Sequence, residues 1–247
     1  MDGQTVVDVL TDAHGAQYER DGYLILDHVD VPAGTLDAVV DDLDGLYVSP
    51  AHEEDGIHYG VHRIRNAWRR SPNIKALALA PNVLAILEAL YGRKPLGWQT
   101  LNFWKGTEQK AHSDTLHFNS DPPGFMCGVW IALEDIDMDK GPVFYYPSSH
   151  KLPEVTMQDA GLQPGWSEYK KYEAFIAELA ARKGFETHFA TLQKGQALIW
   201  AANLLHGGSE RRDRSSTRHS QVTHYFFEGC RAWQPATSEG EDITLLD

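Results

Sequence analysis

The chain has 247 residues, of which 42% are hydrophobic, 11% aromatic and 23% charged. This composition is typical of a folded domain with a sizeable core, and the length is ordinary for one domain. The formal net charge of -13 argues against a general nucleic-acid partner or an anionic membrane surface.

Cysteine usage and the apolar runs indicate the compartment. Only Cys127 and Cys230 are present, so no disulfide framework is expected and a reducing compartment is the default. The N-terminal stretch lacks a basic region followed by an apolar one, which would mark a secretory signal. The longest apolar runs, at 125–133 and 197–205, are too short to cross a bilayer. We therefore expect a cytoplasmic protein without a membrane partner.

Helices are predicted first along the chain. Apolar residues recur at helical spacing over 36–43 and again over 83–90. Pro81 and Gly92 flank the second stretch at the positions where helices begin and end. The sequence therefore predicts a helical N-terminal layer over about residues 1–95.

From about residue 96 the pattern changes to short segments rich in aromatic and β-branched residues, separated by turn signals. The predicted strands lie at 96–105, 125–133, 143–146, 186–192, 197–200 and 221–227. One helix interrupts them, with an apolar stripe over 172–179 and Gly184 as its C-terminal stop. No internal repeat or linker is visible. We predict one domain, 1–247, mainly β with flanking helices (α+β), whose core at about 96–230 is a jelly-roll of two sheets.

Three residues can supply a metal site. His112-Ser113-Asp114 and, far along the chain, His206 offer two imidazoles and one carboxylate. Alternate residues of a strand point to one face, so His112 and Asp114 can aim at one ion. His206 precedes two glycines, where backbone can approach closely. Two histidines and one carboxylate with the remaining positions open are the ligands of non-haem Fe(II) oxygenases.

Arg218 and Ser220 lie where the chain enters the last predicted strand and share a face, so a guanidinium and a hydroxyl can reach one carboxylate. The alternative for Arg218 is a surface ion pair with an acidic residue, and Ser220 can simply fill a strand position. Arg214 is the nearest other candidate for a carboxylate anchor.

These motifs stand in a familiar order. The strings GTEQKAHSDTLHF, VWIALEDID, GPVFYYPSSHK and LLHGGS, followed by Arg218-x-Ser220, resemble the phytanoyl-CoA dioxygenase family over about residues 96–228. The resemblance implies a double-stranded β-helix of the cupin-like kind, with Fe(II), 2-oxoglutarate and O2 as cofactors. One departure is Ser148, where the family often has glycine, and this puts the local turn conformation in question.

The resemblance also assigns residues. It implies that Fe(II) is bound by His112, Asp114 and His206, and that Arg218, helped by Ser220, holds the distal carboxylate of 2-oxoglutarate. Gln109 occupies a position that commonly faces the active site. The implied reaction hydroxylates a small molecule and releases succinate and CO2. A carboxylate at position 114 disfavours halogenation, whereas desaturation, ring formation and dealkylation stay open.

Several histidines are candidates for the pocket. His117 lies at an odd offset from His112, so it points to the opposite face if the strand continues; a turn after Asp114 would cancel that argument. We predict His117 as a residue of the substrate pocket. His224 shares a face with Arg218 and is predicted to line the same pocket, and His150 is expected to fix a loop.

A basic and aromatic segment at 62–70 stands out in this acidic chain. It is either a solvated face between two helices or the rim of the substrate pocket. On the second interpretation Arg63 or Arg65 meets an anionic substrate group and Trp68 packs on the substrate. Three other residues could belong to the same rim: Tyr59, His62 and Asn66.

Other functions use similar residues. A cupin-like metal enzyme without 2-oxoglutarate could use the same three ligands, although Arg218 with Ser220 speaks against it. Zinc hydrolysis is disfavoured because no HExxH spacing is present. A non-catalytic binding protein on the same fold would be favoured by loss of a ligand. We therefore predict an Fe(II)- and 2-oxoglutarate-dependent oxygenase with a small-molecule substrate; the substrate and the oligomeric state stay open.

Overall fold

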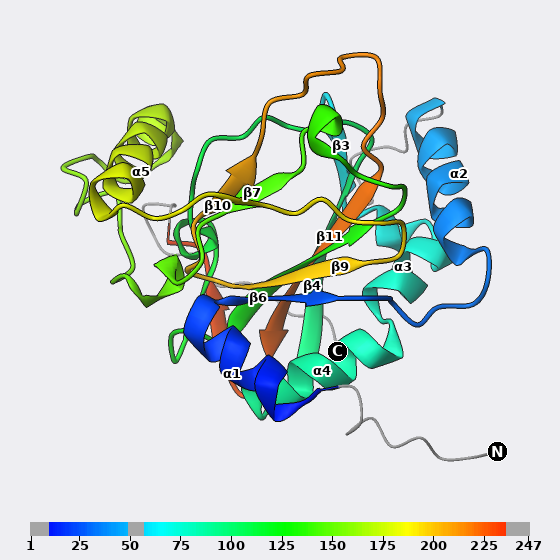
Figure 1. The fold of residues 1–247 in the computed structure, drawn as a ribbon, viewed down its shortest axis with the longest axis horizontal. Coiled ribbons are helices and arrows are strands. Elements are labelled where there is room, and N and C mark those ends of the chain that lie inside the picture. The colour runs from blue at the N-terminus through cyan, green and yellow to red at the C-terminus, as the bar shows by residue number, and fades with distance from the viewer. Residues whose placement is uncertain (1–9, 49–56, 236–247) are drawn as a thin grey trace.

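Two facing β-sheets form the centre of the molecule (Figure 1). The computed structural model describes residues 10–48 and 57–235. The major sheet has seven strands in the order β1-β9-β6-β11-β4-β3-β2, and the minor sheet has three in the order β10-β7-β8. A separate ribbon pairs β12 with β5, and the paired strands are antiparallel throughout. This is the jelly-roll predicted from the sequence.

The strands are β1 (Tyr23–Leu26), β2 (His58–Tyr59), β3 (Arg63–Arg65), β4 (Pro95–Phe103), β5 (Asn119–Asp121), β6 (Met126–Ala132), β7 (Val143–Tyr145), β8 (His188–Phe189), β9 (Ala197–Ala201), β10 (His206–Gly208), β11 (Ser220–Phe227) and β12 (Arg231–Trp233). The helices are α1 (Asp12–Asp21), α2 (Thr35–Val48), α3 (Pro72–Ala78), α4 (Pro81–Tyr91) and α5 (Tyr169–Lys183). Short 3-10 turns near the site are η3 (Ala67–Arg69), η4 (Asp114–Leu116) and η7 (Trp166–Glu168).

The predicted helices are α2, α4 and α5. Helix α4 begins at Pro81 and ends before Gly92, which takes the left-handed conformation at φ 66°. Gly184 ends α5 in the same way at φ 69°. Both stops follow from the freedom of glycine to adopt positive φ at a helix C-terminus.

The N-terminal segment is not only helical. It also supplies β1, which pairs with β9, and the β2–β3 hairpin, which pairs with β4. These strands have four, two and three residues. They are too short for an alternating pattern to stand out in the sequence, and for this reason only helices were predicted there.

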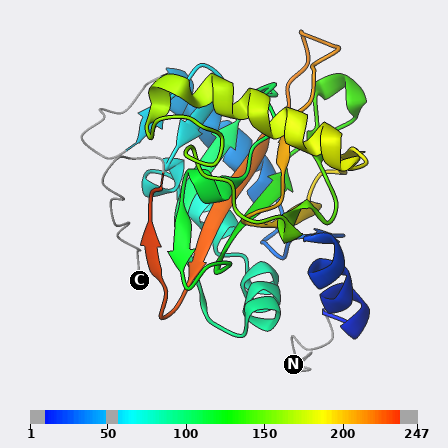
Figure 2. The same ribbon diagram turned by 90° about the vertical axis from the view of Figure 1, so that its left-hand side faces the viewer.

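Buried apolar side chains form clusters between the sheets and against their outer faces. Helices α2 to α4 cover the outer face of the major sheet and share one apolar cluster with it. A second cluster fills the space between the two sheets. Helix α5 packs with residues of the minor sheet in a third cluster, on the opposite side of the molecule from α4, as Figure 2 shows.

Ser148 and His150 fix the chain after β7 to helix α1. Ser148 has a left-handed φ of 67°, which explains why glycine is usual at this position. Its backbone N–H donates to Asp21 O at 2.8 Å. The His150 Nε2 lies 3.2 Å from Glu19 O. His150 therefore fixes this loop, as expected.

The stretch Pro72–Tyr91 is long and apolar enough to pass for a membrane span by length and composition alone. It is not one continuous helix, because α3 ends at Ala78 and α4 begins at Pro81. Its residues Ile74, Leu77, Val83 and Ile86 belong to the buried cluster under the major sheet. The stretch therefore consists of two core helices of the described fold.

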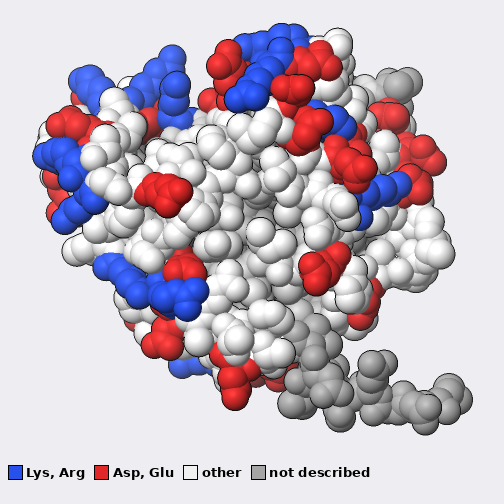
Figure 3. All heavy atoms as spheres, viewed as in Figure 1, with Lys and Arg blue, Asp and Glu red and all other residues white. Residues whose placement is uncertain are grey.

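Charges of both signs are interleaved around the edge of the face shown in Figure 3, and the centre of that face is largely uncharged. No continuous basic surface is present on this face.

Candidate active site

A cavity of about 390 Å³ lies between the two sheets. Residues Gln99, Leu101 and Phe103 of β4 line it, as do Val222 and His224 of β11. Because side chains alternate along a strand, the residues between them point to the outer face and pack under the helices. One face of the major sheet therefore forms one wall of the cavity.

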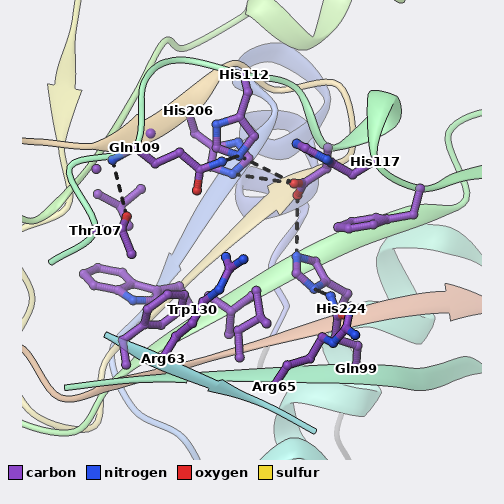
Figure 4. Close-up of a pocket in the computed structure, with 18 of the residues that line it drawn as sticks. Arg63, Arg65, Gln99, Thr107, Gln109, His112, His117, Trp130, His206 and His224 are labelled. Carbon is purple, nitrogen blue, oxygen red and sulfur yellow. Dashed lines mark hydrogen bonds and ion pairs between the residues drawn. The ribbon is translucent and has the colours of Figure 1, made fainter. Parts of the chain in front are cut away.

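Two imidazoles and one carboxylate meet inside this cavity (Figure 4). The ligand atoms of His112, Asp114 and His206 all lie within 4.8 Å of one another, and the three residues are buried. Asp114 Oδ1 is 3.9 Å from the Nε2 atom of each histidine. Three donor atoms so placed can hold one metal ion and leave its other positions open.

The backbone brings the two histidines together. His112 and His206 form an isolated antiparallel bridge, with reciprocal N–H to O distances of 2.9 and 3.0 Å. A Cβ at Gly207 would lie 2.6 Å from Gln109 O, so only glycine fits beside this bridge. Asp114 is the first residue of η4, not part of a strand. The two side chains converge as predicted. The predicted reason, alternation along one strand, is wrong, because Asp114 lies in η4.

Hydrogen bonds fix the tautomers of the two histidines. His112 Nδ1 is 2.9 Å from Lys110 O, and His206 Nδ1 is 2.9 Å from Leu204 O. A carbonyl only accepts, so each Nδ1 carries the hydrogen and each Nε2 presents a lone pair. Burial is the main cause that lowers the pKa of both residues to about 4. They are therefore neutral at physiological pH, as metal ligands must be.

Trp200 orients the carboxylate. Its Nε1 donates to Asp114 Oδ2 at 2.8 Å. Gly128 lies opposite Trp200 in the register of β6 and β9, and a Cβ there would lie 2.3 Å from the indole. Glycine at position 128 therefore gives the indole room to reach Asp114.

His224 lies on the other side of the carboxylate. Its Nε2 is 3.7 Å from Asp114 Oδ2, and its Nδ1 is 3.2 Å from Gln99 Nε2. An amide nitrogen donates, so Nδ1 accepts and the ring hydrogen on Nε2 faces Asp114. Burial lowers the pKa of His224 to about 4. His224 lines the cavity, where the sequence placed it, whereas Gln99 was not singled out.

Arg218 is a buried cation that lines the cavity. Its side chain is 3% exposed, and burial, followed by repulsion from Arg211, lowers its pKa to about 10. It stays protonated at neutral pH. Its Nη1 donates to Gly141 O at 3.3 Å, but within the described residues Nε has no hydrogen-bond partner and no carboxylate forms an ion pair with it.

The indole N–H of Trp130 is a second hydrogen-bond donor at the cavity. It lines the cavity, its Nε1 is buried and makes no hydrogen bond to the described residues, and its ring centroid is 5.4 Å from Arg218 Cζ. Buried donors are rarely left unpaired in proteins. This pair of residues therefore fits a carboxylate ligand.

Three other predicted residues take different positions. Gln109 lines the cavity, and its Nε2 is 3.3 Å from His112 Nε2. Ser220 is fully buried but is not part of the cavity lining, and its hydroxyl donates to Arg218 O at 3.4 Å. Arg214 forms an exposed ion pair with Glu108 at 2.7 Å. Of the two arginines considered as an anchor, the structure places only Arg218 at the cavity.

The turn at η4 brings His117 into the cavity. Its ring centroid is 5.6 Å from that of His112. His117 Nε2 is 2.9 Å from the Tyr169 hydroxyl, and its ring stacks on Trp166 at 5.2 Å and 13°. Both aromatic residues line the cavity. They were not predicted, because nothing in the sequence indicates that α5 and η7 fold back over the metal site.

The predicted rim divides into two parts. Arg63 and Arg65 line the cavity, whereas Ile64 between them is fully buried on the other face of the sheet. Trp68 is 8% exposed and belongs to the apolar cluster under the helices. The prediction that Trp68 packs on the substrate is therefore wrong, because η3 carries its ring to the outer face.

His62 and Asn66 are not part of the cavity lining. The His62 ring packs against Trp104 at 5.8 Å, and Asn66 is a left-handed residue at φ 61° before η3. The side chain of Tyr59 lies outside the described residues.

Solved structures share this fold. SnoK, a non-heme alpha ketoglutarate dependent carbocyclase from nogalamycin biosynthesis, superimposes with a TM-score of 0.74 at 16% identity, covering 100% of this chain and 97% of SnoK. EctD from S. alaskensis, solved with 2-oxoglutarate and 5-hydroxyectoine, has a TM-score of 0.74 at 19% identity, covering 97% of this chain and 83% of EctD. These similarities confirm the predicted fold.

Sequence comparison identifies the family. The mouse phytanoyl-CoA dioxygenase domain-containing protein 1 is 26% identical over 116 residues, which cover 45% of this chain and 38% of the mouse protein. The aligned region thus spans less than half the length of that relative. The family model for phytanoyl-CoA dioxygenase (PhyH) matches residues 18–220. Since this match covers most of the chain, the protein belongs to the phytanoyl-CoA dioxygenase family.

Proposed function

We propose that this protein is an Fe(II)- and 2-oxoglutarate-dependent oxygenase that hydroxylates a small molecule and releases succinate and CO2. One observation carries the proposal: two neutral imidazoles and a carboxylate converge in the cavity that also holds Arg218, a buried cation that forms no ion pair with an acidic residue of the described chain. Family membership and the structural similarity to EctD support it.

His112, Asp114 and His206 would hold the iron. Their donor set suits Fe(II), because neutral imidazole and carboxylate leave open positions on the ion. Trp200 holds the Asp114 carboxylate in place through its hydrogen bond to Oδ2. Bound there, Fe(II) together with 2-oxoglutarate and O2 would supply the oxidising chemistry for hydroxylation.

Arg218 would hold the distal carboxylate of 2-oxoglutarate, with the Trp130 indole N–H as a second donor. Both donors lack partners among the described residues, and both line the cavity. A charge-assisted hydrogen bond is strong where water is excluded. Ser220 supports this anchor through the backbone carbonyl of Arg218, which its hydroxyl contacts.

The test is substrate-dependent succinate release. Purified protein is supplied with Fe(II), 2-oxoglutarate and O2, and succinate is measured with a panel of candidate small molecules while mass spectrometry follows their oxidation. Asp114→Ala is the negative control. Arg214→Ala, an arginine outside the cavity, is the matched control for Arg218→Ala.

We expect 2-oxoglutarate to be consumed in step with oxidation of one class of compound. Oxidation that proceeds without 2-oxoglutarate would identify a cupin-like enzyme of another type. Consumption of neither 2-oxoglutarate nor any candidate by iron-loaded protein would favour a binding protein and contradict the proposal.

A further inference from the structure

Two arginines of β3 line the cavity. In the register of β3 and β4, Arg63 lies opposite Phe103 and Arg65 opposite Leu101, and all four residues line the cavity. Within residues 10–48 and 57–235, neither guanidinium forms an ion pair or a side-chain hydrogen bond with a neighbour. Two like charges thus stand side by side on one cavity wall.

Their charge acts inside the cavity. Arg63 and Arg65 line the same cavity as the clustered ligand atoms of His112, Asp114 and His206. Burial, followed by repulsion from Arg63, lowers the pKa of Arg65. Because each arginine disfavours the charge of the other, an anion bound between them would relieve the repulsion.

Aromatic side chains line the cavity as well. Trp166 stacks on His117, and the Trp98 and Phe118 rings meet edge to face at 5.1 Å. Trp166 is 52% exposed, although tryptophan is usually well buried. In Figure 4, Arg63 and Arg65 enter from the strand on one side and His117 lies on the other. These rings offer a stacking surface for a flat apolar group.

We propose that the substrate is a small anion with a flat apolar body. Its carboxylate or phosphoryl group would sit between Arg63 and Arg65, and its body would lie against Trp166 and His117. This inference rests on the proposed function, because it concerns the same cavity. The volume of about 390 Å³ is near the lower end for ligand pockets and is shared with the co-substrate, so the part of the substrate that enters is small.

Probes of similar shape but different charge test the inference by binding alone. Equilibrium dialysis would measure 1-naphthylacetate, its neutral counterpart 1-naphthylacetamide, and 1-naphthyl phosphate. The protein is kept anaerobic with Fe(II) and saturating 2-oxoglutarate, so that Arg218 is already engaged. The variants are Arg63→Ala/Arg65→Ala, Trp166→Ala and, as a matched control, Arg212→Ala, an exposed arginine outside the cavity lining.

We expect the wild-type protein to prefer the anions over the amide by about five-fold for each arginine engaged. The double variant should lose this preference, whereas Arg212→Ala should keep it. Trp166→Ala should weaken all three probes together. The ratio of carboxylate to phosphate binding identifies which anion the pair selects.

Equal binding of anion and amide by wild-type protein would overturn the inference, as would a preference that survives in the double variant. Failure of every probe to bind at millimolar concentration would also contradict it. Substrate-free succinate formation by the wild-type protein is measured separately. Its absence counts against the proposed function, while the binding ratios still decide the question of the anion.

Discussion

The two faces of the major sheet differ in chemistry although the same strands build both. On the outer face, Ile199, Tyr225 and Phe227 pack into the apolar cluster under the helices. Two polar residues there share hydrogen bonds: Asn102 Nδ2 donates to Gln221 Oε1 at 2.9 Å, and Gln221 Nε2 donates to Ile74 O at 3.2 Å. The outer face therefore stabilises the fold.

The inner face lines a cavity whose polar groups are costly to bury. His224 belongs to β11 of this sheet, and four further buried residues line the same cavity from other segments of the chain: His112, Asp114, His206 and Arg218. Taking such groups out of water disfavours folding unless partners compensate for the lost hydration. Arg218 lacks an acidic partner among the described residues, so we expect bound ligands to supply the missing interactions at the cavity. Substitutions at the cavity should therefore impair ligand binding with little loss of stability, whereas substitutions on the outer face should lower stability.

The largest effect is expected at the metal ligands. His112→Ala, Asp114→Ala and His206→Ala should each abolish coupled turnover and weaken Fe(II) binding, because each removes one of three donor atoms. The unfolding midpoint in the absence of metal should change little, since the apolar clusters do not include these residues. Iron titration, succinate assays and thermal melts would check this. Wild-type activity in any one variant would contradict the assignment of that ligand.

Trp68→Ala should lower stability and not act selectively on ligand binding. Its ring belongs to the outer-face cluster, so truncation should lower the free energy of unfolding by about 3–5 kcal/mol. Arg65→Ala, only three residues earlier but on the cavity side, should change stability by less than about 0.5 kcal/mol and raise the substrate concentration needed for turnover. Urea unfolding and steady-state kinetics separate the two. A stable Trp68→Ala protein with a selective loss of substrate binding would restore the rim role of Trp68.

Much of the fold follows from the sequence. Long elements such as α5 and β11 carry apolar patterns over eight or more residues, and their positions were predicted. Strands β1, β2 and β3 were not predicted, because two to four residues give no readable period. What places them is pairing with β9 and β4, and this is decided by tertiary contacts.

The site is predictable in its ligands and less so in its surroundings. His112, Asp114, His206 and Arg218 indicate the proposed chemistry because two imidazoles and a carboxylate suit Fe(II) and a guanidinium suits a carboxylate. The contact of Trp200 with Asp114 depends on a register between distant strands, which the sequence does not display. Whether Trp68 faced the cavity or the helices depended on one turn of η3.

Arg218→Ala tests the buried cation that lines the cavity. The variant removes a charge-assisted contact worth about 1.5–3 kcal/mol, which corresponds to a roughly ten- to hundred-fold weaker hold on 2-oxoglutarate. Fe(II) affinity should change much less, because Arg218 is not one of the three clustered ligands. The 2-oxoglutarate dependence of succinate release checks this, with Arg214→Ala as control. An unchanged dependence would place the anchor elsewhere.

The smallest effect is expected from a neighbouring pair on β9 that divides between the two faces. Trp200→Phe keeps a ring on the inner face but removes the N–H that donates to Asp114 Oδ2. Loss of a residue that hydrogen-bonds a metal ligand typically weakens metal affinity by about 10–100-fold. We expect about ten-fold weaker Fe(II) binding, because His224 still lies beside the carboxylate. Ile199→Val, on the outer face, should instead lower stability by about 0.5–1.5 kcal/mol. Its iron affinity should stay unchanged. Anaerobic Fe(II) titration and urea unfolding of both variants would show the two effects separately. Equal loss of stability in both, with no change in iron affinity, would mean that Trp200 only packs between the sheets.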